Sequence, residues 1–368
     1  MKIFKIIAAM LTCVVLLASC TGDSSNVVIS AKDTQSADIT ANMYNYWAST
    51  SKANFMHSYT DIEDTDEFWH SEYEEGKTYA EYLDSLVLED IKTTAVCLSL
   101  YNEMRLSLTE SQREAIDNTI NGYLSEYAGG NKNTLNNALS AYGANMSILR
   151  EVKEAEAKRT LVYDFLFSEG GEKALRDEDY EKYYQENYYH FQIIYINNKY
   201  EYVLDSKGNY TTNADGTYVT RALSGDALDA KNQSIKTVCD KIAAGEDFDS
   251  LFNTYSEQKT YTNGYYFTAS DSYSNAVFYK LIGDISSIEE GETTVAEYDS
   301  GTYIMKRLPL DENAWNQSIN KDFFNSFETL AANAAFRVFT SEQFDSLTID
   351  TEFISKYSVA NVNANDLF

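Results

Sequence analysis

The sequence contains few of the residues on which metal sites and hydrolytic centres depend. Its 368 residues include three histidines, His57, His70 and His190, which are scattered along the chain. Four cysteines are present, and none belongs to a CxxC pair. This argues against a zinc site, a disulfide framework and a histidine-based triad. We therefore expect neither a metal ion nor a cofactor.

Positive charge is also scarce. The chain has 29 Lys and Arg against 57 Asp and Glu, which gives a formal net charge of −28. Phosphate binding requires clustered Lys and Arg, so the balance argues against a nucleic-acid partner. The same excess of acid keeps the body of the chain off an anionic membrane surface. It either favours cationic clients or serves solubility alone.

Long hydrophobic runs are missing except at the N-terminus. Ile6–Ala18 is apolar and uncharged, and Lys2 and Lys5 precede it. It is shorter than the roughly 20 apolar residues that span a bilayer, but it suits the core of a signal peptide. It leads into Leu17–Cys20, with small residues before the cysteine. This order resembles the lipobox of bacterial lipoproteins, whose cysteine takes a diacylglyceryl group and becomes the mature N-terminus.

We therefore expect residues 1–19 to be a lipoprotein signal peptide and Cys20 to carry a lipid. The lipid would attach the chain to the extracytoplasmic face of the cell membrane. An ordinary secretory signal with an accidental cysteine is the alternative. Residues 20–37 are rich in Ser, Asp and Asn, which predicts a flexible tether.

Helical periodicity dominates residues 38–185 and predicts an N-terminal helical domain. The acidic stretch Asp61–Glu67 has no glycine for the sharp turn of a calcium loop, so we read it as a solvated loop. Thr109 and Ser111 are helix-start residues, and Gly129-Gly130 is a stop signal. The expected helices cover 38–60, 77–106, Thr109–Tyr127, Leu135–Tyr142, Ile148–Phe167 and Asp177–Tyr184.

The periodicity changes after residue 186, where Tyr189–Ile196 is rich in β-branched and aromatic residues and predicts a strand. Turn signals at Asp205–Gly208 and Asn213–Gly216 predict a hairpin insertion at about 198–222. Further elements are expected as helices at 227–243, 248–255 and 275–281, strands at 265–267 and 301–308, and a helix at 315–339.

This order predicts the α+β class, with a small antiparallel sheet and helices at 186–310 set inside an otherwise helical chain. Residues 311–368 would supply a C-terminal helix. That helix would pack on the N-terminal domain, because alone it would expose a wide apolar face.

Five segments of the middle block resemble the parvulin family of peptidyl-prolyl isomerases. The most specific is Ala244–Ser256 (AGEDFDSLFNTYS), which is similar to the family's "aGedFaxLAxxyS". The others follow the family's order, and they are Phe191–Ile196, Asn263–Phe267, Phe278–Ile285 and Gly301–Lys306. The helical flanks and the lipobox further resemble the foldase lipoproteins of Gram-positive bacteria (PrsA-like) and the periplasmic chaperone SurA.

That resemblance implies an all-α chaperone domain that cradles unfolded or newly exported polypeptides, with a parvulin-like domain inserted in it. X-Pro segments would be among the clients. Uncatalysed X-Pro isomerisation takes tens to hundreds of seconds, and a chain that waits this long exposes apolar surface. Such a protein would act as a foldase, with or without isomerase activity.

The family's site is a proline pocket floored by two histidines on adjacent strands, with a Cys or Asp and a small hydroxyl. The resemblance places Gln192 and Tyr303 at the two histidine positions, and Gln258 and Ser300 at the other two. Gln and Tyr can hydrogen-bond, but neither changes charge near neutral pH as His does. The sequence thus implies a degenerate site, weak or inactive, and leaves open whether isomerase activity survives.

A strand register shifted by two residues would instead make His190 the first histidine. The aromatic walls of the pocket would be Tyr266, Phe267, Tyr273 and Phe278. All of these residues could equally be polar remnants of a vestigial cleft or ordinary core.

Three functions therefore compete: a membrane-tethered foldase or holdase, a true isomerase, and a solute-binding or adhesive surface lipoprotein that reuses the fold. No two-lobed repeat of βα units supports the third.

Overall fold

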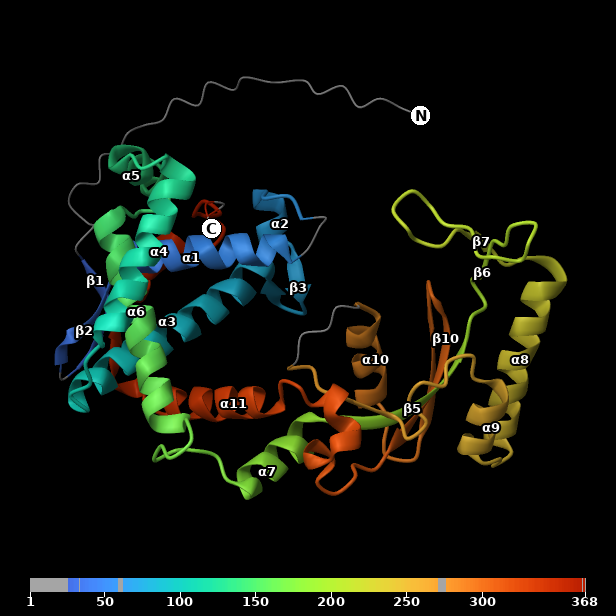
Figure 1. The fold of residues 1–368 in the computed structure, drawn as a ribbon. Coiled ribbons are helices and arrows are strands. Elements are labelled where there is room, and N and C mark those ends of the chain that lie inside the picture. The colour runs from blue at the N-terminus through green and yellow to red at the C-terminus, as the bar shows by residue number, and fades with distance from the viewer. Residues whose placement is uncertain (1–25, 33, 59–61, 271–275, 366, 368) are drawn as a thin grey trace. The chain divides into compact units, whose positions relative to one another are not determined.

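A computed structural model describes residues 26–32, 34–58, 62–270, 276–365 and 367. The expected signal peptide, Cys20 and Tyr273 lie outside these residues. The chain divides into two units (Figure 1). The first comprises the residues up to Ala174 together with Ala335–Phe368, and the second comprises Leu175–Ala334, so the second interrupts the first in sequence.

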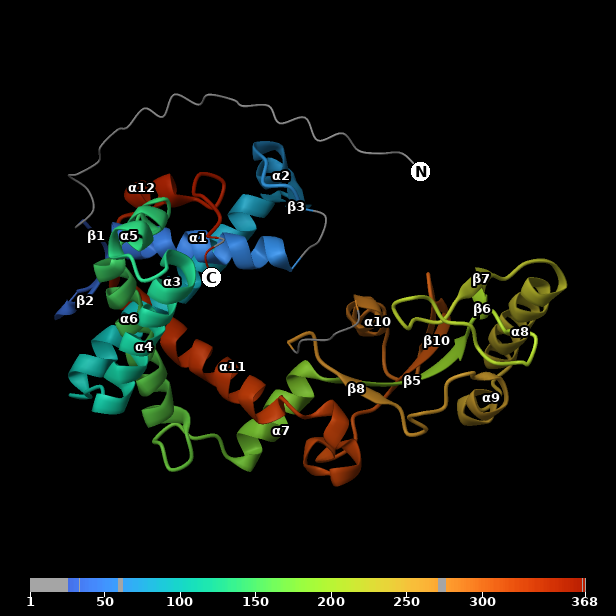
Figure 2. The same ribbon diagram turned by 45° about the horizontal axis from the view of Figure 1, so that its top comes forward.

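Helices make up most of the first unit (Figure 2). They are α1 (Ala41–His57), α2 (Asp66–His70), α3 (Tyr79–Glu103), α4 (Glu110–Ala128), α5 (Lys132–Ser140), α6 (Met146–Phe167) and α12 (Thr351–Ile354). Thr109 forms a capping box with Gln112 at the start of α4, and Gly129 ends that helix with a left-handed φ of 54°. The predicted start and stop of this helix are therefore confirmed.

A three-stranded antiparallel sheet also belongs to the first unit. It has the order β11-β1-β2, with β1 at Val27–Ala31, β2 at Thr34–Thr40 and β11 at Leu347–Ile349. Residues 27–31 fall in the segment that we expected to be a tether, but Val28 and Ile29 are buried in the strand. The apolar run there is too short to reveal a strand whose partner lies near the other end of the chain.

A short helix begins inside the expected acidic loop Asp61–Glu67, and a short hairpin follows that helix. Helix α2 begins at Asp66, because Thr65 Oγ1 accepts a hydrogen bond from Phe68 N at 3.2 Å. A small hairpin, β3 (Glu72–Glu74) with β4 (Lys77–Thr78), leads into α3.

Helix α3 is central to the first unit, where it packs against α1, α6 and β2. Its buried residues include Ile91 and Val96. Helix α11 (Phe327–Ser341) crosses the boundary between the units in the sequence. Within the first unit its Phe336 contacts Tyr163 and Phe167 of α6, with ring centroids 5.2 and 5.5 Å apart.

The second unit is built on a four-stranded antiparallel sheet of order β8-β5-β10-β9. The strands are β5 (Tyr189–Ile196), β8 (Tyr265–Phe267), β9 (Thr293–Tyr298) and β10 (Gly301–Leu308). Strand β9 was not predicted, because it is an edge strand with no fully buried residue, in which exposed and half-buried side chains alternate. The sheet and its helices confirm the predicted α+β class.

Helices cover both faces of this sheet (Figure 1). On one face Phe191, Ile193 and Met305 pack against α10 (Ala276–Ser286). On the other, Ile194, Ile196 and Ile304 pack against two further helices. These helices are α8 (Gly225–Ala243) and α9 (Phe248–Tyr255). The strands thus sit between two apolar layers, as their alternating side chains require.

An aromatic cluster joins α7 (Asp177–Asn187) to the beginning of α11 and to β8. It contains Tyr183, Tyr184, Tyr188, Tyr266, Phe324 and Phe327. The expected helix from residue 315 begins only at Phe327, after two short 3-10 turns, Ala314–Asn316 and Ser318–Phe323. Asn313 precedes these turns with a left-handed φ of 54°. Because α7 and the residues around Phe324 and Phe327 pack together in the aromatic cluster, the second unit extends beyond the expected limits of 186 and 310.

The predicted hairpin insertion consists of β6 (Tyr200–Tyr202) and β7 (Thr220–Ala222), with two tight loops between them.

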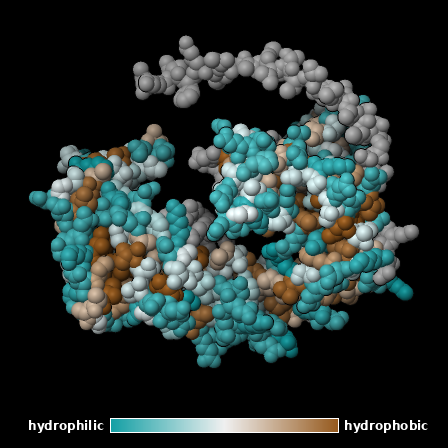
Figure 3. Space-filling view, turned by 180° about the vertical axis from the view of Figure 1, so that it is seen from behind, coloured by the Kyte–Doolittle hydropathy of each residue, from teal (hydrophilic) through white to brown (hydrophobic). Residues whose placement is uncertain are grey.

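In the space-filling view, hydrophilic side chains cover most of the visible surface and apolar ones gather in separate patches (Figure 3). Within the part of the chain that the structure describes, no helix combines the length and apolar composition needed to cross a membrane.

Candidate functional site

The register of β5 and β10 decides which candidate residues share a face of the sheet. Tyr303 lies opposite Tyr195, and Lys306 lies opposite Gln192, in an unbroken antiparallel ladder. Because side chains alternate along a strand, Tyr303 and Tyr195 are on the α10 face and Gln192 is on the other. The structure therefore does not bring Gln192 and Tyr303 together. Tyr303 instead lies beside Tyr195, whose sequence position indicated only that it belongs to a strand rich in aromatic and β-branched residues.

Tyr195 and Tyr303 form the polar centre of the α10 face. Their ring centroids are 5.0 Å apart. Tyr195 donates its hydroxyl hydrogen bond to the main-chain oxygen of Ser300 at 2.5 Å, and the Tyr303 hydroxyl lies 3.0 Å from Ser300 Oγ. The structure thus places two of the expected site residues, Ser300 and Tyr303, in contact.

Burial raises the pKa of three tyrosine hydroxyls on this face, so these three stay protonated at physiological pH. Burial raises the pKa of Tyr195, and the neighbouring Tyr200 and Tyr303 add to the effect. Burial likewise raises the pKa of Tyr298, which also hydrogen-bonds to the Asp284 carboxylate. Burial raises the pKa of Tyr265 to about 12. Such groups can donate and accept hydrogen bonds, but they do not supply a base near neutral pH.

The two glutamines among the expected site residues have different environments. Gln192 is only 3% exposed, and its amide donates to Thr262 O at 3.0 Å. Gln258 is exposed, and its main-chain oxygen accepts from Ser256 Oγ at 2.7 Å. Ser256 Oγ in turn accepts from Tyr195 N at 3.2 Å, which ties the end of α9 to β5. Gln192 fixes the loop before β8 rather than facing an open cleft.

His190, the alternative first histidine, is also buried. Its Nδ1 lies 2.8 Å from Pro309 O and its Nε2 lies 2.9 Å from Asn263 O. The imidazole stacks on Tyr266 with centroids 4.2 Å apart. A polar cavity of about 150 Å³ adjoins His190 and Arg307. With both ring nitrogens held by the main chain, His190 is placed to support the fold.

The expected aromatic walls are largely core residues. Tyr266 and Phe267 are 2% and 5% exposed. The Tyr266 hydroxyl hydrogen-bonds to the Asp311 carboxylate, and the Phe267 ring lies 5.5 Å from that of Phe191. Phe278 lies in α10, but its side chain, like all of Tyr273, is outside what the structure describes. Tyr266 and Phe267 therefore do not line an open pocket.

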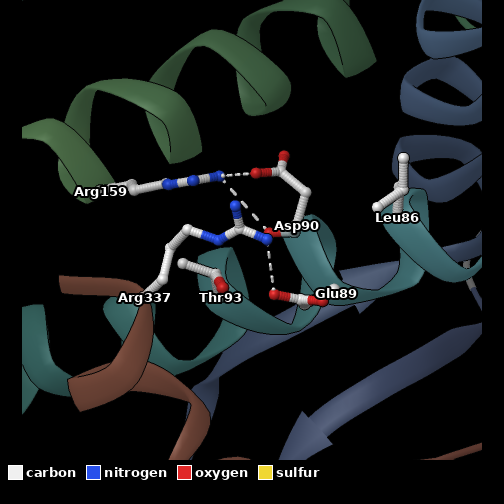
Figure 4. A pocket seen from close by; sticks show the side chains of 6 residues that line it. All are labelled: Leu86, Glu89, Asp90, Thr93, Arg159 and Arg337. Atoms are coloured by element: carbon white, nitrogen blue, oxygen red, sulfur yellow. Dashed lines mark hydrogen bonds and ion pairs between the residues drawn. The ribbon is translucent and has the colours of Figure 1, made fainter. Parts of the chain in front are cut away.

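The first unit contains a polar pocket of about 270 Å³ that sequence reasoning missed (Figure 4). It is lined by Leu86, Glu89, Asp90 and Thr93 of α3, Arg159 of α6 and Arg337 of α11. Arg337 donates to Glu89 at 2.9 Å, and Arg159 donates to Asp90 Oδ1 at 2.7 Å. The pocket therefore offers strong donors and acceptors side by side, with balanced charge.

A second pocket in the first unit, of about 240 Å³, is more apolar. Tyr44, Leu88 and Ile354 line it beside Asp84. Burial raises the pKa of Asp84, although hydrogen bonds from Ser358 and Val359 oppose the shift. Asp84 accepts from Val359 N at 2.8 Å, so this carboxyl also holds the C-terminal segment. Across the described residues no group of three His, Cys, Asp or Glu side chains is arranged to hold a metal ion.

No protein-family model matches the chain, and no curated protein matches it. Solved structures that are similar include the foldase protein PrsA of Streptococcus pneumoniae, at 17% identity and a TM-score of 0.22, covering 78% of this chain and 90% of that one. PrsA of Bacillus subtilis is 14% identical, with a TM-score of 0.23 and coverage of 87% and 92%. The peptidylprolyl isomerase PrsA of Bacillus cereus is 12% identical, with a TM-score of 0.26 and coverage of 91% and 97%.

Proposed function

We propose that this chain is an extracytoplasmic foldase of the parvulin type, anchored by a lipid on Cys20, that binds unfolded or newly exported polypeptides. The observation that carries the proposal is the insertion of the α+β unit Leu175–Ala334 into a mainly helical unit. Its parvulin-like segments fall on the strands and helices of one sheet domain. The comparison structures named as foldase proteins agree with this assignment.

The most specific of those segments has a clear structural reason for its sequence. In Ala244–Ser256, Gly245 takes a φ of +84° between α8 and α9, a conformation that favours glycine. Asp247 caps α9 by accepting from Ser250 N at 2.9 Å. Phe248, Leu251 and Phe252 then pack under Ile194 and Ile304. The resemblance therefore includes the turn, the cap and the core positions.

Binding is favoured over catalysis. Two tyrosines occupy the polar centre of the α10 face, burial raises the pKa of one of them, Tyr195, and the one histidine of this unit, His190, is buried. Nothing in that arrangement supplies a group that titrates near pH 7 and reaches a client. Twisting an X-Pro amide would depend on hydrogen bonds from Tyr195 and Tyr303 alone, so we expect isomerisation to be slow or absent.

The first unit offers two kinds of contact for an extended client. The arginine and carboxylate groups at Glu89, Asp90, Arg159 and Arg337 match the donors and acceptors of a peptide main chain. The pocket beside Tyr44 suits an apolar side chain. Main-chain recognition would make binding largely independent of client sequence, as a general foldase requires.

The test is suppression of client aggregation. The chain without residues 1–19, with Cys20→Ser to prevent lipidation, is mixed with several chemically unfolded clients in the absence of ATP. Light scattering should fall as the molar ratio of this protein to client rises. Unchanged scattering for every client would refute the foldase proposal.

Isomerase activity is tested separately with a protease-coupled X-Pro peptide assay. Gln192→Ala and Tyr303→Phe serve as variants. A rate clearly above background that Tyr303→Phe lowers would establish a true isomerase, and a background rate would leave client binding as the activity. The remaining alternative, a solute-binding or adhesive lipoprotein, would be supported by a defined small ligand that raises the melting temperature.

A further inference from the structure

The hairpin insertion, residues 200–222, contains an eight-residue repeat. Tyr202, Tyr210 and Tyr218 recur at this interval, and the turns Asp205–Gly208 and Asn213–Gly216 lie between them. Gly208 and Gly216 take φ values of +82° and +85°, so both turns use the left-handed conformation. Figure 1 shows the resulting pair of loops beyond β6 and β7. We call residues 200–222 the tyrosine ribbon.

The three repeated tyrosines form one exposed cluster. Their ring centroids lie 5.2–5.6 Å apart in all three pairings. The residues are nevertheless 44%, 58% and 55% exposed. The rings therefore pack against one another and still present much of their surface to solvent.

The main chain makes this arrangement a closed, rigid unit. Three main-chain hydrogen bonds, each 2.9 Å long, close a ring. They run from Val203 N to Val219 O, from Val219 N to Thr211 O and from Thr211 N to Val203 O. Each of these residues directly follows one of the three tyrosines, so the repeat in the sequence becomes a threefold repeat in the structure. A rigid aromatic surface loses little conformational entropy on binding.

The ribbon is also nearly neutral, in a chain whose net charge is −28. Asp205 accepts from Lys207 N and Asn209 N, and Asp215 accepts from Thr217 N, so both carboxylates are engaged by their turns. Glu201 pairs with Arg221 at 2.7 Å at the base. Beside the rings lie the exposed Leu204 and the amide and hydroxyl groups of the turns, several of which also hydrogen-bond within the ribbon.

We infer that the tyrosine ribbon binds a neutral glycan. The C–H faces of sugar rings would lie against the tyrosine rings, and sugar hydroxyls would hydrogen-bond to the Asn and Thr side chains of the turns. A neutral, polyhydroxylated ligand matches a surface that has aromatic, amide and hydroxyl groups and little net charge. The site is distinct from the pockets of the proposed foldase function.

Retention on insoluble glycans tests this inference. The chain without residues 1–19 and with Cys20→Ser is passed over chitin, cellulose and amylose, which separate N-acetylated, β-linked and α-linked sugars. We expect retention on at least one glycan, unaffected by added salt because the ligand is neutral. Tyr210→Ala or Tyr218→Ala should weaken the binding about tenfold, whereas Tyr127→Ala, a change at a tyrosine 39% exposed in the first unit, should not.

A ribbon deletion guards against misfolding of the single variants. Tyr200 and Ala222 are paired neighbours in β6 and β7, so a two-residue Asn-Gly turn can replace residues 201–221. This variant should lose glycan retention and still suppress client aggregation. No retention on any of the three glycans, or equal retention without the ribbon, would overturn the inference. A ribbon deletion that kept glycan retention but abolished client protection would also overturn the inference. That result would assign the surface to polypeptides instead.

Discussion

Tyr195 and Tyr303 face each other across the two central strands of the second unit, and Ser300 links their hydroxyl groups. The main-chain oxygen of Ser300 accepts from Tyr195, and its Oγ lies 3.0 Å from the Tyr303 hydroxyl. Burial raises the pKa of Tyr195, so its hydroxyl keeps its proton near neutral pH. This pair, and not Gln192 with Tyr303, is the polar centre of the α10 face.

Tyr195→Phe should lower the free energy of unfolding by about 1 kcal/mol, because it removes a partly buried hydrogen bond and leaves Ser300 O without its donor. Tyr303→Phe removes a bond to a side-chain hydroxyl that can rotate to another partner, so its effect should be smaller. Urea titration of both variants measures the difference. The reverse order would contradict the assigned hydrogen bonds.

His190→Ala should destabilise the second unit by about 2–4 kcal/mol, because a cavity opens beside the buried Tyr266 and two main-chain carbonyls lose their contact with the imidazole. Suppression of client aggregation by the folded fraction should not change. His70→Ala, at an exposed site, should alter stability by less than about 0.5 kcal/mol and serves as the control. If His190→Ala left stability intact but abolished activity, His190 would belong to the functional site after all.

Local sequence signals predicted local structure well. The start of α4 at Thr109 and its end at Gly129 depend on a capping box and a left-handed glycine, both of which act within a few residues. Strand β5 and the ribbon turns were also evident from residue type. Strand β1 was not, because it pairs with β11, and Ile29 meets Ile349 only after the whole chain has folded.

The candidate site was harder to predict for a related reason. A single strand shows which residues alternate, but not which residue of the neighbouring strand lies opposite. Gln192 and Tyr303 both fit the family's histidine positions, yet the ladder pairs Tyr303 with Tyr195. The pocket at Glu89 and Arg337 was equally invisible, since its members come from three helices that are distant in sequence.

The two arginines of that pocket should differ in their effect on stability. Arg337 and Glu89 form a largely exposed pair, so Arg337→Ala should change the free energy of unfolding by less than about 1 kcal/mol. Arg159 is more buried and also reaches Thr94 Oγ1 at 3.2 Å, so Arg159→Ala should cost more. Under the proposed function both variants should weaken client protection, and Lys182→Ala in an exposed pair provides the control. Equal protection by all three variants would exclude the pocket as a client site.

Cys20→Ser should release the full-length chain from the membrane if this cysteine is lipidated. The variant should appear in the soluble extracytoplasmic fraction, and it should no longer incorporate a labelled fatty acid. Cys13→Ser, within the expected signal peptide, should leave labelling unchanged. Continued labelling of the Cys20→Ser chain would rule out the predicted anchor.

Asp84 should make the first unit less stable at neutral pH than at acidic pH. Burial raises the pKa of this carboxyl, so the folded state binds its proton more tightly than the unfolded state does. The resulting stabilisation is fully present below the ordinary pKa of an aspartate, and it is lost as the pH rises through the raised value in the folded state. Asp84→Asn mimics the protonated form and keeps an oxygen to accept from Val359 N.

This variant should therefore be more stable than the unmodified chain at neutral pH, and the difference should shrink as the pH falls below the ordinary aspartate range. Urea titrations over a pH series measure it. Asp84→Ala removes the acceptor for Val359 N and should be destabilising even at low pH, which separates the charge effect from the hydrogen bond. A constant difference between Asp84→Asn and the unmodified chain at every pH would mean that the raised pKa does not control this pocket.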